Sequence, residues 1–226
     1  GRDLGELQAR FCARQLLCAV EHLHGKNIIH RDVKPENVLI ADVAGKFRVQ
    51  LADFGLAARN SLGDDTFRGV CGTEGHRAPE MISNLRYTVK VDTWAVGVLV
   101  FMMLEGRHPF RTDNLRARGA VHIKQERRRV LQGRFRLNAK WVGGPAEDFL
   151  KKVLEVNPEK RLSSAQAFEH VWLGGATVAE GMRVLARAVV HEREEQRAME
   201  IEKRVECLMR REVGVSVKGS REVCLL

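Results

Sequence analysis

The chain has 226 residues, which suits one or two domains, and its 44% hydrophobic and 30% charged residues exclude wholesale disorder and a collagen-like protein. Its five scattered cysteines form no CxxC pair, which argues against a disulfide scaffold or a zinc site and favours a reducing compartment, the cytoplasm or the nucleus. The net charge is +9, and the longest apolar run, residues 94–104, is too short to span a bilayer, so no membrane partner is expected.

The first half of the chain predicts one helix, a hairpin and a loop. Apolar residues recur at helical spacing over residues 7–23, which predicts an amphipathic helix. Residues 38–40 and 49–51 are short strand-like runs separated by a turn that contains Gly45, which indicates a hairpin. Residues 56–77 are polar and glycine-rich, which is typical of a mobile loop.

Three helices are predicted further along the chain. Residues 91–104 are almost wholly apolar, which predicts a buried central helix rather than a surface one. Residues 149–156 have one apolar face and precede Asn157-Pro158, which predicts a helix that stops there. Ser163 and Ser164 are candidate caps for a short helix that runs to His170.

The positive charge is concentrated in one stretch. Residues 107–140 carry eleven basic and two acidic side chains, a difference of nine that equals the whole net charge. No nucleic-acid motif is recognisable there, so nucleic acid is not expected as a partner. A solvated helix face and loop is the favoured interpretation, and a docking surface for an acidic or phosphorylated partner is the alternative.

Three short motifs carry the chemistry, and they occur in a fixed order. They are His30-Arg31-Asp32 with Asn37 five residues after the aspartate, then Asp53-Phe54-Gly55, then Ala78-Pro79-Glu80. In this order and at these distances the motifs resemble those of eukaryotic protein kinases. The resemblance covers about residues 1–173 and only the large C-terminal lobe of that fold.

The resemblance implies a mainly α (α+β) fold, the kinase-like C-terminal lobe with a small β-hairpin. The 226 residues contain no GxGxxG loop, no matching strand lysine and no partner-helix glutamate. The small N-terminal lobe is therefore expected to be absent, and the chain is expected to be a fragment. Such a fragment is expected to bind ATP weakly and to transfer no phosphate alone.

The implied reaction is phosphoryl transfer from ATP, with Mg²⁺, to serine or threonine hydroxyls of protein substrates. Asp32 is expected to orient the attacking hydroxyl and accept its proton, and Lys34 to neutralise charge on the phosphate. Asn37 and Asp53 would supply the hard oxygen ligands that Mg²⁺ prefers. The predicted cofactor-binding residues are Asp3 at the ribose, Leu39 under the adenine, and Lys34, Glu36, Asn37 and Asp53.

The resemblance also indicates substrate class. Lys34 together with Thr73 is the serine/threonine pattern, and residues 35–37, 67–73 and 170–173 are most similar to the calcium/calmodulin-dependent group. Glu36 stands where basophilic members meet a substrate arginine. Protein substrates with basic residues near the acceptor are therefore expected, with a relaxed preference because Met102 replaces a second acid.

Other matching positions are expected to be structural. His30 and Phe54 are packing residues in the family, and Gly55 completes its motif. Asp92 stands where the family has a buried aspartate that holds the catalytic-loop backbone, and Arg161 stands where it has the partner of Glu80. His76 and Arg77 depart from the family pattern before Ala-Pro-Glu.

Regulation is expected to involve the loop that precedes Ala-Pro-Glu. The resemblance implies that Arg31 can pair with a phosphate on this loop. Gly69 stands where many relatives carry the phosphothreonine, so we expect activation to be independent of phosphorylation at that position. Candidate acceptors are Ser61, Thr66 and Thr73, of which Thr66 is the best remaining one.

Residues 174–212 are predicted to form a helical extension and residues 213–226 a flexible tail. Residues 176–212 carry eight basic and eight acidic side chains, whereas a calmodulin target is basic on one face. Calmodulin is therefore not expected as a partner. Packing or a coiled coil is the favoured role, and autoinhibition is the alternative.

The sequence is compatible with two functions. The favoured one is a serine/threonine kinase, because Asp32, Lys34, Asn37 and Asp53 are all intact. The alternative is a catalytically inactive kinase-like binding or scaffold protein, which the missing small lobe favours.

Overall fold

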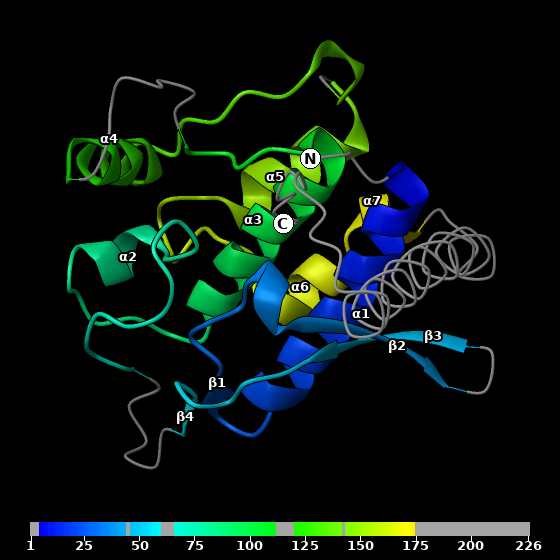
Figure 1. Ribbon diagram of the computed structural model, residues 1–226, viewed down its shortest axis with the longest axis horizontal. Coiled ribbons are helices and arrows are strands. Elements are labelled where there is room, and N and C mark those ends of the chain that lie inside the picture. Colours follow the sequence, from blue (N-terminus) through cyan, green and yellow to red (C-terminus); the bar gives the residue numbers. More distant parts are fainter. Residues whose placement is uncertain (1–4, 44–45, 60–65, 112–119, 142, 175–226) are drawn as a thin grey trace, which may run out of the picture.

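The structure, a computed structural model, describes residues 5–43, 46–59, 66–111, 120–141 and 143–174 (Figure 1). Asp3, Ser61, the extension beyond residue 174 and the tail lie outside the described residues. The elements, in chain order, are α1 (Glu6–His24), β1 (Ile28–Ile29), η1 (Pro35–Asn37), β2 (Val38–Val43), β3 (Lys46–Leu51), β4 (Ala58–Arg59), α2 (Pro79–Ile82), α3 (Lys90–Glu105), α4 (Ala120–Leu131), η2 (Ala139–Trp141), α5 (Pro145–Val153), α6 (Ser164–Phe168) and α7 (Val171–Gly174).

Helix α3 lies at the centre, with α1, α5 and α6 packed around it (Figure 1). Twelve of its 16 residues are buried, so it is covered on all sides and the prediction of a buried central helix is confirmed. At Gly97 a Cβ would lie 2.7 Å from Val153 Cγ2, which explains why the closest approach of α3 to α5 takes a glycine.

Helix α1 is amphipathic, as predicted, and extends one residue beyond the predicted range at each end. Its buried positions recur with the helical period, and they face α3 and α6. Gly25 caps the carboxyl end, where its N–H donates to the Glu21 carbonyl. The helix leads directly into β1 and the loop that carries His30-Arg31-Asp32.

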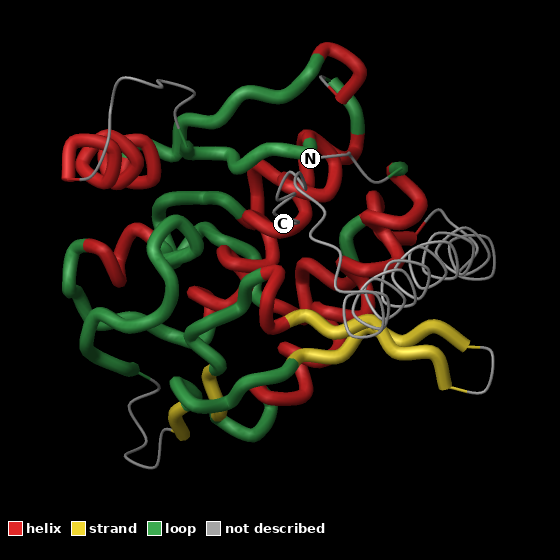
Figure 2. The backbone as a smooth tube through the Cα atoms, in the orientation of Figure 1, coloured by secondary structure: helices red, strands yellow, loops and turns green. Residues whose placement is uncertain are grey.

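The predicted hairpin is formed by β2 and β3, which pair from Val38–Leu51 to Val43–Lys46 (Figure 2). Each strand is three residues longer than predicted, because residues 41–43 and 46–48, next to the turn, belong to the ladder as well. Strands β1 and β4 form a second antiparallel pair. This pair was not predicted, because strands of two residues are too short to give a recognisable pattern in the sequence.

The loop predicted over residues 56–77 is more structured than expected. Besides β4 it contains a backbone bridge between Phe67 and Tyr87, whose rings stack with centroids 6.2 Å apart. The Tyr87 hydroxyl donates to the carbonyls of Arg68 and Gly69 at 3.2 and 3.1 Å. The described part of this loop is therefore anchored to the segment that precedes α3.

The predicted helix over 149–156 exists, but its bounds were wrong. Helix α5 starts at Pro145, whose fixed φ suits a first helical residue, and it ends at Val153. Helix α6 has the predicted Ser163 cap in a complete capping box with Gln166. It ends at Phe168 instead of His170, and α7 follows.

The basic stretch contains α4, at the edge of the molecule (upper left in Figure 1). Within the ranges that the structure describes, the helices are all too short or too polar to span a bilayer.

Candidate active site

The first motif lies on a loop held by the start of α3. The carboxylate of Asp92, which is only 1% exposed, accepts the backbone N–H of His30 at 2.8 Å and of Arg31 at 2.9 Å. Arg31 has a φ of 67°, a conformation that non-glycine residues rarely adopt. Two charge-assisted hydrogen bonds therefore fix the backbone just before Asp32.

His30 positions this loop by hydrogen bonds to backbone on both sides. Its Nδ1 accepts the N–H of Asp32 at 3.3 Å, and its Nε2–H donates to the Ala52 carbonyl at 3.1 Å. These two partners require the neutral tautomer with the proton on Nε2. The ring is fully buried and meets Phe54 edge-on at 5.1 Å, although Phe54 itself is 49% exposed.

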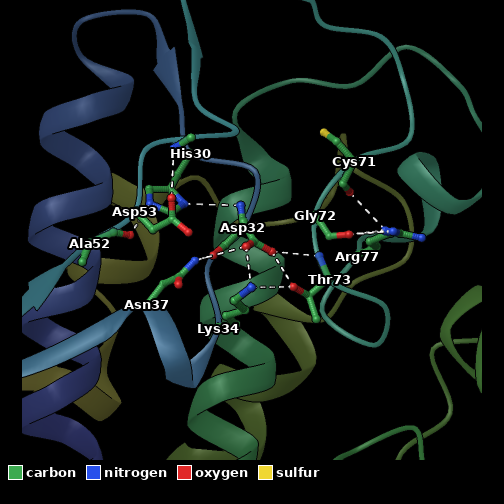
Figure 3. A network of polar contacts seen from close by, with 11 residues as sticks. His30, Asp32, Lys34, Asn37, Ala52, Asp53, Cys71, Gly72, Thr73 and Arg77 are labelled. Carbon is green, nitrogen blue, oxygen red and sulfur yellow. Dashed lines mark hydrogen bonds and ion pairs between the residues drawn. The ribbon is translucent and has the colours of Figure 1, made fainter.

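Asp32 lies at the centre of a polar network (Figure 3). One carboxylate oxygen, Oδ1, accepts the Thr73 N–H at 2.8 Å and its hydroxyl at 2.7 Å. The other, Oδ2, pairs with Lys34 Nζ at 2.7 Å and accepts Asn37 Nδ2 at 3.1 Å. Lys34 also donates to the Thr73 hydroxyl at 2.9 Å, so the structure brings four side chains together here.

The charges of this network support one another. Burial acts to raise the pKa of Asp32, but hydrogen bonds from Lys34 and Thr73 outweigh it and hold that pKa below its ordinary value. The hydrogen bond to Asp32 raises the pKa of Lys34. At neutral pH the site therefore contains a carboxylate and an ammonium group.

The loop that carries Thr73 depends on a glycine. Gly72 has a φ of 80°, and a Cβ there would lie 2.2 Å from the Arg31 carbonyl oxygen. Only glycine lets this loop approach the catalytic loop so closely. That approach places Thr73 against Asp32.

Arg77 supports the same loop and lies to the right of Gly72 in Figure 3. Its Nε and Nη2 donate to the Gly72 carbonyl at 2.9 and 2.6 Å, and its Nη1 donates to Glu74 at 2.7 Å. Glu74 in turn pairs with Arg127 of α4 through both carboxylate oxygens. The residue that departs from the family pattern thus holds the loop through backbone contacts.

The side-chain oxygens of Asn37 and Asp53 suit Mg²⁺. Asn37 uses its Nδ2 to donate to the carbonyl and the carboxylate of Asp32, which leaves its Oδ1 as the acceptor. Asp53 is exposed and accepts one hydrogen bond, from the Gly55 N–H at 3.1 Å. In the described ranges no group of three or more His, Cys, Asp or Glu side chains forms a metal cage.

The other predicted nucleotide residues are open to solvent. Leu39 on β2 is 51% exposed, and Glu36 on η1 is exposed as well. Asp3 lies outside the described residues. Leu39 therefore offers an uncovered apolar surface at the edge of the site.

The regulatory candidates occupy separate positions. Arg31 Nε donates to the Leu56 carbonyl at 2.6 Å, and the Thr66 hydroxyl accepts from Arg86 at 3.3 Å. The hydroxyl of Thr73 is engaged by Asp32 and Lys34.

Glu80 and Arg161 form a buried bidentate ion pair between α2 and the segment after α5. The two nitrogen–oxygen distances are 2.6 and 2.9 Å. The Arg161 guanidinium also lies over the Trp94 ring at 5.0 Å.

Three residues shape the site in ways that were not predicted from the sequence. Gly72 and Arg77 hold the Thr73 loop, and His24 of α1 contacts Asp92 Oδ2 through its Nε2 at 3.0 Å. Gly72, as a glycine in a predicted loop, permits a positive φ, but the sequence does not specify one. The other two contacts had no signal in the sequence, because Arg77 binds backbone and His24 is 68 residues from its partner.

Comparisons with known proteins show which chains this one is similar to. The family described as "Protein kinase domain" matches residues 2–173. The chain is 35% identical over 188 residues to the serine/threonine-protein kinase H1 homolog of Danio rerio, which covers 81% of this chain and 43% of that protein. It is 34% identical to serine/threonine-protein kinase H1 of Homo sapiens, over 81% of this chain and 42% of that protein. It is 36% identical over 173 residues to calcium/calmodulin-dependent protein kinase type IV of Mus musculus, over 75% of this chain and 35% of that protein. The chain thus spans less than half the length of these relatives.

Proposed function

The chain belongs to the protein kinase family, among serine/threonine kinases similar to the calcium/calmodulin-dependent group, and from that premise we propose that it supplies the lower half of an ATP-dependent phosphoryl-transfer site. In this proposal residues 1–173 are the C-terminal lobe. The absence of a GxGxxG loop from the 226 residues supports the lobe assignment. The half-exposed Leu39, Phe54 and Leu56 support it too, because they would face a covering lobe.

The single observation that carries the proposal is the network around Asp32. A carboxylate that binds Lys34 and Thr73 is ionised and fixed in direction. It can therefore accept a hydrogen bond, and later the proton, from a hydroxyl that lies beside it. Lys34, held next to it, places a positive charge where a transferring phosphate would carry negative charge.

The reaction needs more positioning and charge neutralisation than covalent chemistry. Mg²⁺ supplies charge neutralisation and orientation of the nucleotide phosphates when it is bound. Asn37 Oδ1 and the Asp53 carboxylate are the groups that would hold it. Leu39 would contact the base of the nucleotide.

The proposed substrates are proteins with serine or threonine acceptors and basic residues nearby. Glu36 supports this, because its carboxylate is exposed two residues after Lys34. A substrate arginine could pair with the exposed carboxylate. Met102, in the place of a second acid, is only partly buried and offers no charge.

Activation is proposed not to require a phosphate at the loop position that Gly69 occupies in this chain. The Tyr87 hydroxyl already holds the carbonyls of Arg68 and Gly69, and Arg31 already holds the Leu56 carbonyl. Thr66 stays the best candidate acceptor, because its hydroxyl lies near the Arg86 guanidinium.

The test is a phosphotransfer assay on the intact protein as its gene encodes it, including any sequence upstream of Gly1. Radiolabelled ATP and Mg²⁺ are supplied with matched peptides whose only acceptor is serine, threonine or tyrosine, each with and without an arginine near it. The proposal predicts label on serine and threonine, with more on the arginine-containing peptides. Label on tyrosine alone, or none with any peptide, would contradict it.

A further inference from the structure

A groove of about 970 Å³ lies beside α4, away from the network around Asp32. The residues between α3 and α4, the last turns of α4 and the segment that follows α4 line it. Six arginines and no acidic residue are among them, namely Arg107, Arg111, Arg128, Arg129, Arg134 and Arg136. All six are exposed. We call this feature the arginine groove.

Few of these charges are neutralised within the molecule. Arg107 pairs with Glu105 at 3.2 Å, and Arg111 is 4.0 Å from Glu126, whose pKa is raised by burial. Arg128, Arg134 and Arg136 have no side-chain hydrogen bond or ion pair within the described ranges. The arginine groove is therefore a concave surface of unpaired positive charge, which favours a negatively charged occupant.

Two of the arginines are held in position by backbone. Arg107 Nη2 donates to the Arg136 carbonyl at 2.6 Å, and Arg129 Nη1 donates to the Arg111 carbonyl at 3.1 Å. These contacts tie the three lining segments together without using a carboxylate. The free arginines next to them keep their planar guanidinium groups available, and such groups bind carboxylates with two hydrogen bonds.

The floor of the arginine groove argues against nucleic acid. Its one aromatic side chain, Phe135, is partly buried and packs edge-on against Phe101 and Phe110, with centroids 5.8 and 6.4 Å away. That ring belongs to the core and does not offer a free face for stacking a base. The groove therefore lacks the platform that single strands use.

The positions of the arginines favour a partner with several negative charges over a partner with one. The side chains of residues 134–136 alternate in direction. The Phe135 ring points into the core, while Arg134 and Arg136 both line the groove. The remaining arginines come from two other segments around it. Charges spread in this way match a chain of carboxylates better than a single phosphate.

We propose that the arginine groove docks an extended, acidic segment of a partner protein, rich in aspartate and glutamate. Helix α4 is also tied to the Thr73 loop, because Arg127 pairs with Glu74 at 2.7 Å. A partner bound in the groove would thus lie on the helix that contacts the substrate-facing loop. The inference does not depend on phosphoryl transfer.

The test measures binding by fluorescence polarisation with the full 226-residue chain. The probe is a short labelled peptide in which glutamate alternates with serine, and its control replaces each glutamate by glutamine. The groove variant is Arg134→Glu with Arg136→Glu. The matched variant, Lys26→Glu with Lys160→Glu, makes the same charge change at exposed lysines outside the groove.

We expect the glutamate peptide to bind and the glutamine peptide not to bind. The groove variant should weaken binding of the glutamate peptide by about tenfold or more, whereas the matched variant should change it by less than about twofold. Circular dichroism confirms that both variants are folded. Equal weakening by the two variants would overturn the proposal, because the attraction would then be general. So would tighter groove-dependent binding of single-stranded DNA, of anionic vesicles, or of a peptide with one phosphoserine and no glutamate.

Discussion

The Thr73 loop shows how one residue sets the geometry of the site. Gly72 is the point where this loop meets the catalytic loop, and the space for a side chain there is filled by the Arg31 carbonyl. Thr73, the next residue, makes two hydrogen bonds to Asp32 Oδ1. Any shift of Gly72 therefore changes the direction of the Asp32 carboxylate.

We predict that Gly72→Ala lowers kcat of the intact protein by about tenfold or more, because small displacements of catalytic groups have large effects on rate. The matched control is Gly69→Ala, which also has a positive φ, of 98°, but has no atom within 4 Å of its Cβ. Steady-state kinetics on both variants is the measurement. Equal loss in the two variants would mean that backbone strain, and not the contact with Arg31, is responsible.

His108 provides a second residue-scale prediction. It is buried, and its Nδ1 accepts the N–H groups of Phe110 and Arg111, both at 3.2 Å. Burial, with smaller effects from His76 and Arg111, lowers the pKa of His108 to about 3. Since an unfolded histidine titrates near pH ~6.5, the unfolded chain binds a proton that the folded chain does not bind between these two values.

The free energy of unfolding should therefore fall as the pH falls below about 6.5, by up to about 1.4 kcal/mol per pH unit from this residue. We predict that His108→Asn, which keeps an acceptor near the Nδ1 position, makes this dependence shallower. Urea unfolding at several pH values measures it. The exposed His22→Asn is the control, and an unchanged slope for His108→Asn would refute the assignment.

At the scale of single residues, the sequence predicted the residues of the motifs but not the contacts that hold them in position. Asp32, Lys34 and Asn37 were predicted as site residues, and Thr73 was predicted only as a companion of Lys34 and a candidate phosphate acceptor. The structure brings all four into one network. The pairing of Glu74 with Arg127 joins residues 53 positions apart, and no local pattern marks it.

Among the elements, α2 is fixed by one ion pair. Glu80 at its second position is 5% exposed, and Arg161 also donates to the carbonyls of Glu155 and Lys90. Removing one partner would leave a buried charge without compensation.

We predict that Glu80→Gln lowers the free energy of unfolding by about 3–5 kcal/mol, as for other broken buried pairs. The control is Lys151→Gln, which disrupts the surface pair of the exposed Lys151 with Glu147 on α5 and should cost less than about 1 kcal/mol. Urea unfolding of the 226-residue chain measures both. Similar small losses in the two variants would show that the Glu80–Arg161 pair does not hold α2.

Elements with a strong period were predicted well, and short ones were not. The apolar periodicity of α1 and the uniform apolarity of α3 identify these helices directly. The strands β1 and β4 have two residues each, and α2 has four, so contacts distant in sequence define them. The ends of β2 and β3 next to the turn mix polar and apolar residues and were not predicted as strand, although they pair in register.

For the whole molecule, the sequence predicted a kinase-like lobe, and the family match supports the kinase assignment. The sequence places the excess positive charge in residues 107–140, but only the structure shows that arginines of this stretch line a groove. Three segments that are separate in sequence contribute its arginines.

We predict that the 226 residues alone bind ATP weakly and transfer no measurable phosphate. In the proposed function Asn37, Lys34 and the exposed Asp53 would contact a nucleotide from one side only, and solvent would reach its phosphates from the other. Nucleotide titration and a radiolabel assay, run beside the intact gene product, measure this. Robust transfer by the 226 residues would contradict the prediction.

The central claim is that Asp32 acts in the chemical step, and turnover of Asp32→Asn in the intact protein tests it most directly. Kinetics and nucleotide titration are measured together, with Asp53→Asn as the contrast. We predict that Asp32→Asn lowers kcat by about 10² to 10⁴ and leaves ATP affinity nearly unchanged, whereas Asp53→Asn weakens binding of ATP with Mg²⁺. Near-normal turnover of Asp32→Asn would contradict the claim.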